Sequence, residues 1–259
     1  MNTAGLFRPG NTLIHRMNPY TKLVLATSFS IAGFLAPGLP VPLALLLISI
    51  ALLFVAQAAQ EVGKTIFKFV LFFMIVLFVV QSLWWSGGES PIYMLGPLSI
   101  HVDGFMYSCV VASRLLTVLC SFYLMMFTTH PSDLVFSLEQ RGLPSKISYV
   151  ILATMQSIIE MQERAAVIME VQKCRGVETE GSLANRAKAY FPLIGPLIIG
   201  SVLNIESRAL ALEVRGFSSS IKKTYLKVFT DMPWERWLRY PLIAFPFVVL
   251  AARLIWPTQ

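Results

Sequence analysis

Long uncharged stretches dominate the pattern of hydrophobic and polar positions. No Asp, Glu, Lys or Arg occurs between residues 23 and 60, and apolar residues also fill 69–85 and most of 104–128 and 240–256. A helix of about 18 or more such residues is long enough to cross the hydrocarbon layer of a bilayer. The pattern therefore predicts an all-α integral membrane protein.

Proline and glycine divide the first of these stretches into two helices. Pro37, Gly38, Pro40 and Pro42 follow one another closely, as residues of a turn do. With this division, the sequence predicts about five transmembrane helices and a loop over residues 86–103. The predicted spans are 20–36, 41–58, 69–85, 104–128 and 240–256.

Two long amphipathic helices are predicted after the fourth span. Over 147–171 the apolar residues recur at steps of three and four, which aligns them along one side of a helix. A second helix is predicted over 183–214. Its apolar centre, 191–203, is too short to cross a bilayer unaided. Both helices are therefore expected at the cytoplasmic face, packed on each other.

These patterns divide the chain into three parts. Residues 1–128 are predicted to form a membrane domain with four spans, 129–239 a cytoplasmic domain of long amphipathic helices, and 240–259 the last transmembrane helix. The cytoplasmic domain is expected to begin with a short helix over 132–140, for which Ser132 is the predicted N-cap.

The charge distribution predicts the orientation. The chain has a net charge of +7, but it is 56% hydrophobic and only 14% charged, whereas soluble domains carry about 25% charged residues. Lys and Arg gather in the cytoplasmic loops of membrane proteins. The N-terminal segment carries Arg8, Arg16 and Lys22, while residues 86–103 carry only acidic charges. We therefore expect a cytoplasmic N-terminus and no binding of nucleic acid.

Residues that could support catalysis or bind a metal are scattered. Cys109, Cys120 and Cys174 have no metal-ligand spacing, and the three histidines lie far apart in the sequence, so no metal site is predicted. The sequence contains no Walker glycine loop and no evident pair of nucleophile and base. It therefore favours a protein that is not an enzyme.

Both predicted amphipathic helices end in Arg-Gly. Arg175-Gly176 ends the first and Arg215-Gly216 ends the second. Glycine after a helix end and arginine in the last turn are both common, so each pair taken alone is explained as a cap. Together they also suit a chain that must hold two similar partner subunits, because each helix end would present a planar guanidinium to an acidic groove.

Other basic positions have more than one interpretation. Arg141-Gly142 is followed by Leu-Pro, which favours a turn between helices over a third partner site. Arg114 lies within the fourth span, where arginine costs about 2.5–3.5 kcal/mol on insertion scales. It should therefore face carbonyl groups or Gln81 of another span, or a partner protein. His15-Arg16 is either a basic pair at the membrane interface or a pair with a specific structural role.

The apolar side of the first amphipathic helix is rich in methionine. Met155, Ile158, Met161 and Met169 belong to this region. These side chains can form ordinary helix core. Methionine also suits surfaces that repack against different partners, so an interface with another membrane protein is the second interpretation.

With these features the chain resembles the transmembrane T component of energy-coupling factor (ECF) transporters. The two Arg-Gly ends resemble the paired Ala-Arg-Gly motifs of that family's coupling helices, with Cys174 and Val214 in place of alanine. A Thr-His-Pro-Ser-Asp segment at 129–133 and a basic-aromatic segment at 222–225 also match. The residues that match the family's opening motif are Phe7, Pro9, Gly10, Thr12, His15, Arg16, Met17, Asn18, Pro19, Thr21, Lys22 and Leu23.

The resemblance implies a coupling function without catalysis. Two ABC-type ATPase subunits would bind Arg175-Gly176 and Arg215-Gly216, and their ATP-driven closure would move the coupling helices. A separate substrate-binding membrane protein, the S component, would lie on the apolar stripes, where Met155, Ile158, Met161 and Met169 form the predicted interface. ATP and Mg would be bound by the partner ATPases, so no cofactor is expected in this chain. The expected location is the cell membrane.

Three alternatives remain open at this point. A membrane enzyme acting on lipid or prenyl substrates would usually show acidic clusters, whereas Asp103, Asp133 and Asp231 are isolated in the sequence. A conventional ABC permease would have a single coupling helix and line a pore. A membrane scaffold would have no ATPase partners. In the ECF interpretation the substrate, a vitamin or a metal ion, would be selected by another chain.

Overall fold

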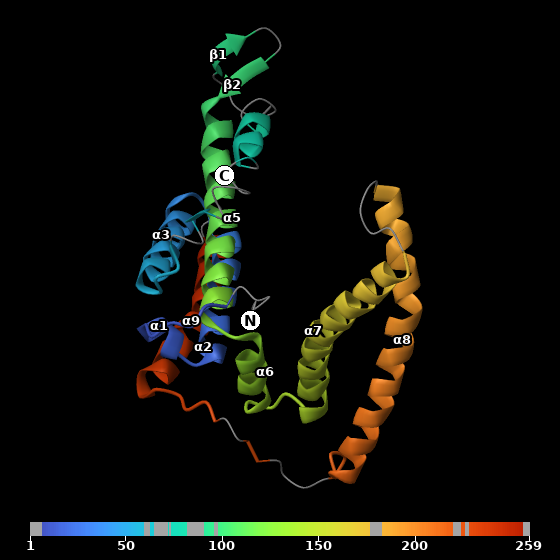
Figure 1. The fold of residues 1–259 in the computed structure, drawn as a ribbon. Helices are drawn as coiled ribbons and strands as arrows, with labels where there is room; N and C mark the ends of the chain where they lie inside the picture. The colour runs from blue at the N-terminus through green and yellow to red at the C-terminus, as the bar shows by residue number, and fades with distance from the viewer. Residues whose placement is uncertain are drawn as a thin grey trace. The chain divides into compact units, whose positions relative to one another are not determined.

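The fold is helical apart from one small hairpin (Figure 1). The computed structural model describes residues 7–59, 63–64, 72, 74–81, 91–95, 98–176, 183–219, 224–225 and 228–255. Its helices are α1 (Leu13–Arg16), α2 (Pro19–Leu35), α3 (Pro40–Val55), α5 (Val102–Thr128), α6 (Pro131–Glu139), α7 (Ser145–Cys174), α8 (Leu183–Val214) and α9 (Pro233–Ile255), and its antiparallel strands are β1 (Pro91–Leu95) and β2 (Leu98–His101).

The chain packs as two compact units. The first contains residues 1–141 and 228–259, and the second contains 142–227. This division follows packing, whereas the predicted boundaries after 128 and 239 concern the membrane and stay a prediction. Helix α6 and the residues before α9 thus pack with the spans.

Helix α2 lies at the centre of the first unit, between α5 and α9, and α3 packs on α5 and, less extensively, on α2. Small buried residues allow this close packing. Ala26 and Ala32 of α2 are fully buried, and Ala32 packs with Phe29 and with Val249 of α9. The Ser28 hydroxyl donates to the carbonyl of Leu242. The two ends of the sequence are thereby joined in one bundle.

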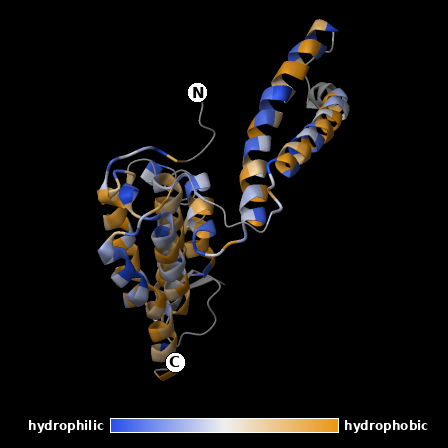
Figure 2. Ribbon diagram, turned by 90° about the horizontal axis from the view of Figure 1, so that it is seen from below, coloured by the Kyte–Doolittle hydropathy of each residue, from blue (hydrophilic) through white to orange (hydrophobic). Residues whose placement is uncertain are grey.

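Many large apolar side chains are exposed on this bundle, and Figure 2 shows how hydrophobic residues are distributed along its helices. Ile31 and Phe34 of α2, Phe54 of α3, and Phe247 and Val248 of α9 are all exposed. A large exposed apolar surface is unfavourable in water and indicates contact with lipid or protein. The described helices that are long and apolar enough to cross a membrane are Gly104–Thr128, Phe191–Val214 and Pro233–Ile255, and Pro40–Val55 is a shorter apolar helix. Phe191–Val214 extends beyond the apolar centre 191–203 that was expected to be too short to span, so the cytoplasmic place of α8 stays a prediction. The prediction of an all-α membrane protein is confirmed.

In the second unit, α7 and α8 pack antiparallel. Tyr149 contacts Phe217 with ring centroids 5.1 Å apart. Further along α7, Arg208 Nη2 of α8 lies 2.6 Å from Glu160 Oε1, and a guanidinium nitrogen of Arg164 lies 3.4 Å from the carbonyl oxygen of Gly200. Residue numbers fall along α8 as they rise along α7, so the C-terminal ends of the two helices lie at opposite ends of this pair.

Several predicted elements match the structure, with differences at their ends. Helix α8 has the predicted bounds, α7 ends at the predicted Arg175-Gly176 pair and extends a few residues beyond the 147–171 stripe on both sides, and α9 begins at Pro233 rather than 240. The loop predicted over 86–103 contains the β1–β2 hairpin. Of the predicted span 69–85, residues 74–81 are helical and most of the rest lies outside the described residues.

The predicted N-cap of the short helix is wrong. Helix α6 begins at Pro131, and its N-cap is His130, whose Nδ1 accepts a hydrogen bond of 3.3 Å from the backbone N–H of Ser132. Proline favours the first helical position because its φ suits a helix and its missing N–H would be unpaired there anyway. Pro131 therefore starts the helix two residues earlier than Ser132 would allow as the cap.

Candidate coupling and partner-binding sites

Helices α7 and α8 end in a similar way. Arg175 and Arg215 each follow the last helical residue, and the glycine after each has a positive φ, +84° for Gly176 and +68° for Gly216. After α8, the Gly216 N–H donates to Glu213 O at 2.9 Å, and the next residue's N–H donates to the carbonyl of residue 212 at 3.0 Å. These two bonds define a Schellman cap. The Gly176 N–H makes the corresponding bond to residue 173, at 3.0 Å.

Both guanidinium groups at these ends are available to a partner. Arg175 and Arg215 are exposed, and neither side chain has a hydrogen bond or an ion pair with another described residue. Because α7 and α8 are antiparallel, Arg215 lies near the start of α7 and Arg175 at its end. At 1.5 Å per helical residue, the two ends are on the order of 40 Å apart.

The third Arg-Gly pair, Arg141-Gly142, differs from the other two in its distance from the helix end and in the contacts of its arginine. Helix α6 ends at Glu139 and its C-cap is Gln140, so Arg141 lies one residue further from its helix than Arg175 or Arg215 does. The Arg141 side chain is engaged: its Nη2 lies 2.9 Å from both carboxylate oxygens of Asp231. The structure thus gives Arg141 an internal role, and Gly142, with φ +115°, forms the predicted turn.

Gly216→Ala should weaken the end of α8, because a left-handed conformation costs an L-residue about 1–2 kcal/mol. A Cβ at Gly216 would meet no atom within 4 Å, so the expected cost lies in the backbone alone. Amide exchange at the α8 end should accelerate by about 5–30-fold. Gly195→Ala is the matched control, since its Cβ also meets nothing and Gly195 lies inside α8. Equal exchange in both variants would contradict the cap assignment.

A buried polar cluster joins the start of α2 to the start of α9. The Glu235 side chain is fully buried, and its carboxylate accepts from the Asn18 backbone N–H at 3.2 Å and from the Thr21 hydroxyl at 3.2 Å. Arg239 Nη2 lies 3.3 Å from Glu235 Oε2, and Arg239 Nε donates to Thr21 Oγ1 at 2.8 Å. The cluster therefore gives the Asn-Pro-x-Thr part of the opening motif a structural role.

Asp231 extends this cluster toward α6. It accepts two bonds from Arg239, at 2.9 and 2.6 Å, one from Asn18 Nδ2 at 2.7 Å, and those from Arg141. The hydrogen bond from Arg239, with a smaller contribution from Arg141, lowers the pKa of Asp231 from its ordinary 3.8 to about 2, although burial acts in the opposite direction. The stabilisation from ionised Asp231 is present above pH 3.8 and is lost as the pH falls to about 2.

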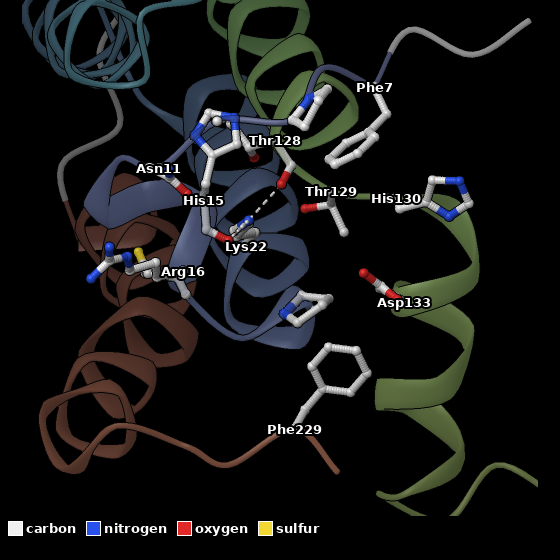
Figure 3. A pocket seen from close by; sticks show the side chains of 14 residues that line it. Phe7, Asn11, His15, Arg16, Lys22, Thr128, Thr129, His130, Asp133 and Phe229 are labelled. Carbon is white, nitrogen blue, oxygen red and sulfur yellow. Dashed lines mark hydrogen bonds between the residues drawn. The ribbon is translucent and has the colours of Figure 1, made fainter. Parts of the chain in front are cut away.

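Two segments that match the family motifs line one pocket of about 330 Å³ (Figure 3). Lys22 Nζ donates to the carbonyls of Thr128, at 2.8 Å, and of His15, at 3.3 Å. Thr12 Oγ1 and His15 Nδ1 lie 2.7 Å apart. Burial and then the nearby Lys22 charge lower the pKa of His15, which favours neutral imidazole at pH 7. His15 thus has specific structural contacts, whereas Arg16 beside it is exposed.

Arg114 faces protein. Its Nη2 donates a 2.7 Å hydrogen bond to the carbonyl of Ala36, the residue that caps the end of α2. This is the contact with another span's carbonyl that the sequence suggested. A helix end has unpaired carbonyls, so α2 supplies an acceptor without losing an internal hydrogen bond.

The four residues proposed for a partner interface lie on α7 but differ in exposure. Ile158 is 52% exposed and Met161 is 42% exposed. Met155 and Met169 are partly buried. Met161 lines a cleft of about 510 Å³ between α7 and α8, and Met169 lines another of about 510 Å³ with Phe191 and Ile194. Part of the apolar stripe thus remains uncovered within the second unit.

Comparison with known proteins places these features in a family. Residues 10–226 match the model of the CbiQ family, described as cobalt transport protein. This match spans most of the chain, from the opening motif through both Arg-Gly ends. The chain belongs to the CbiQ cobalt transport protein family.

Several curated relatives of this CbiQ family member are transmembrane proteins of energy-coupling factor transporters. It is 26% identical over 242 residues to the energy-coupling factor transporter transmembrane protein EcfT of Thermosediminibacter oceani, covering 87% of this chain and 88% of the relative. It is 24% identical over 253 residues to the EcfT of Leuconostoc gelidum, covering 94% of each. A putative ABC transporter ATP-binding protein of Bifidobacterium longum is 27% identical over 236 residues, 86% of this chain and 30% of that protein. The resemblance to the T component of ECF transporters is confirmed.

The polar cluster of this CbiQ family member is not predicted from the sequence. Asp231 is isolated among the acidic residues there, and no motif assigns a role to Glu235 or Arg239. One signal is present in the sequence: Glu235 and Arg239 are four residues apart, as neighbours on one side of a helix are, and both lie at the edge of an apolar stretch. Charges there need partners.

Proposed function

We propose that this chain is the energy-coupling subunit that joins two ABC-type ATPase subunits to a separate substrate-binding membrane protein. The ATPases bind at Arg175-Gly176 and Arg215-Gly216, one subunit at each helix end. The observation that carries this proposal is the pair of similar helix ends: each has a glycine with a positive φ and an exposed guanidinium that has no partner among the described residues. The name of the Bifidobacterium longum relative, an ATP-binding protein that includes a region similar to this chain, supports an association with ATPases.

The uncovered apolar stripe of α7 supports the second partner. Ile158 and Met161 are exposed beside the α7–α8 cleft, and an apolar membrane protein lying on this side would remove them from water. Met155 and Met169 complete the proposed interface. We assign the S component to it, with a vitamin or a metal ion as its substrate. The chain itself contributes no catalysis, and ATP and Mg belong to the ATPases.

Purification of the tagged chain from its native membranes tests this proposal. We expect two ATPase chains and one small membrane protein to co-purify, in amounts that mass spectrometry can identify. A membrane enzyme or a scaffold would purify without ATPases, and a conventional permease would have no additional small membrane protein. The ion pairs of Asp231 with Arg141 and Arg239 count against a diphosphate-binding metal site at that residue.

The proposed location is the cell membrane with a cytoplasmic N-terminus. The start of α9 carries Trp234, Trp237 and Tyr240, all exposed, and such aromatic residues favour the membrane–water interface. In a chain whose three cysteines are replaced by alanine, a cysteine at Ser90 should react with an impermeant maleimide added outside cells. A cysteine at Thr179 should react only after the cells are opened. The reversed labelling pattern would overturn the orientation.

A further inference from the structure

The chain leaves the first unit twice, and the two departing segments are bonded to each other. One segment ends at Arg141 and the other enters at residue 228. The Phe229 backbone N–H donates to Gln140 Oε1 at 3.2 Å, and Arg141 Nη2 lies 2.9 Å from Asp231 Oδ2. Gln140, Arg141, Phe229 and Asp231 thus form a clamp across two segments that are about ninety residues apart in the sequence.

The clamp is anchored in the first unit on both sides. The Arg141 guanidinium carbon lies 4.1 Å from the centre of the Tyr20 ring of α2. Asp231 is held by Arg239 of α9 and by Asn18 at the start of α2. Glu235, fully buried, fixes Arg239 in turn. Every member of this chain of contacts belongs to the first unit, so the clamp does not depend on the position of the second.

The backbone has a positive φ at the residue directly after the clamp. Gly142 follows Arg141 with φ +115°, and a Cβ there would meet no atom within 4 Å. Glycine at such a position permits rotation that other residues resist. A glycine in a conformation that other residues rarely adopt therefore comes directly after the bonded pair, at the boundary of the first unit, which is a suitable place for a hinge.

We propose that the Arg141–Asp231 clamp makes the two segments one joint, through which movement of the second unit passes into α2 and α9. Two separate segments could twist independently and absorb such movement. Bonded together and anchored to α2 and α9, they must move with those helices. The identity of the driving subunits rests on the proposed function, but the joint itself does not.

Spin labels on the two units test the clamp. In a cysteine-free chain, labels at Asn11→Cys and Gln162→Cys, both exposed positions, report the distance distribution between the units in lipid nanodiscs. Arg141→Gln should broaden this distribution by at least about twofold, because the segments are released. Arg141→Lys should stay close to the unmodified chain, since it keeps one ion pair. Arg236→Gln is the control, because Arg236 approaches the same carboxylate only at 3.9 Å and is exposed.

The same labels follow ATP-driven movement when the ATPases are bound. With Arg141 present, ATP should shift the distance. With Arg141→Gln, most of this shift should be lost while ATP hydrolysis persists. An unchanged width in Arg141→Gln, or equal broadening in Arg236→Gln, would overturn the clamp. A failure of the ATPases to bind would refute the proposed function. The width of the distance distribution measured on the chain alone would still test the clamp.

Discussion

Replacing both Arg175 and Arg215 with alanine should leave the chain folded in the membrane but without its ATPase subunits. Neither side chain has a partner among the described residues, so their loss should not alter the thermal midpoint of the chain. Truncating one partner of a buried interfacial charge pair typically costs about 2–5 kcal/mol. Each single variant should therefore weaken co-purification of the ATPases, and the double variant should abolish it.

Each single variant should lose more than half of the ATPase that co-purifies with the unmodified chain, because binding at one site assists binding at the other. Once one ATPase is held, the other binds at a raised effective concentration. Arg→Lys should rescue only in part, since an ammonium cannot reproduce the planar fork of a guanidinium.

Lys173→Ala is the matched control for the loss of a cation. Lys173 is an exposed cation two residues before Arg175, but it does not occupy the cap position. It should retain near-normal amounts of both ATPases. Full recovery of both ATPases with the Arg175→Ala and Arg215→Ala double variant would refute the assignment of these helix ends.

The second large effect is expected at Glu235. Glu235→Ala removes the acceptor that the Asn18 backbone, the Thr21 hydroxyl and Arg239 share, and it leaves a buried guanidinium with less compensation. Breaking a buried ion pair in this way costs about 3–5 kcal/mol. The detergent-solubilised chain should therefore unfold at a clearly lower temperature.

Glu206→Ala is the control for the expected fall in unfolding temperature. Glu206 is exposed on α8, and exposed substitutions usually change stability by less than about 0.5 kcal/mol. Glu235→Gln should fall between the two, because it keeps the shape but presents an amide to donors. Equal unfolding temperatures for Glu235→Ala and Glu206→Ala would show that the cluster does not stabilise the bundle.

Local signals made the amphipathic helices predictable. The apolar centre of α8 over 191–203 and its Arg215-Gly216 end belong to one continuous segment of sequence, so hydrophobic pattern and capping together predict its bounds. The start of α6 was misjudged because two capping signals compete within three residues: Ser132 is a good N-cap, but Pro131 favours the first helical position more strongly.

The polar cluster could not be predicted in the same way. Glu235 meets Asn18 across 217 positions of sequence, and no periodicity relates two segments so far apart. The same holds for Arg114 and Ala36: the cost of a buried charge predicts that Arg114 has a partner, but only the packing of α5 against α2 selects which carbonyl it meets.

Photo-crosslinking next to the two arginines tests the central claim most directly. Cys174 and Val214 directly precede Arg175 and Arg215, and both are exposed, Val214 at 89%. A photoreactive amino acid at each position leaves both guanidiniums in place. In the assembled complex, either position alone should capture one ATPase subunit, and both together should capture two on a single chain. Capture of no ATPase, or of only one by the doubly substituted chain, would contradict the assignment of one ATPase to each helix end.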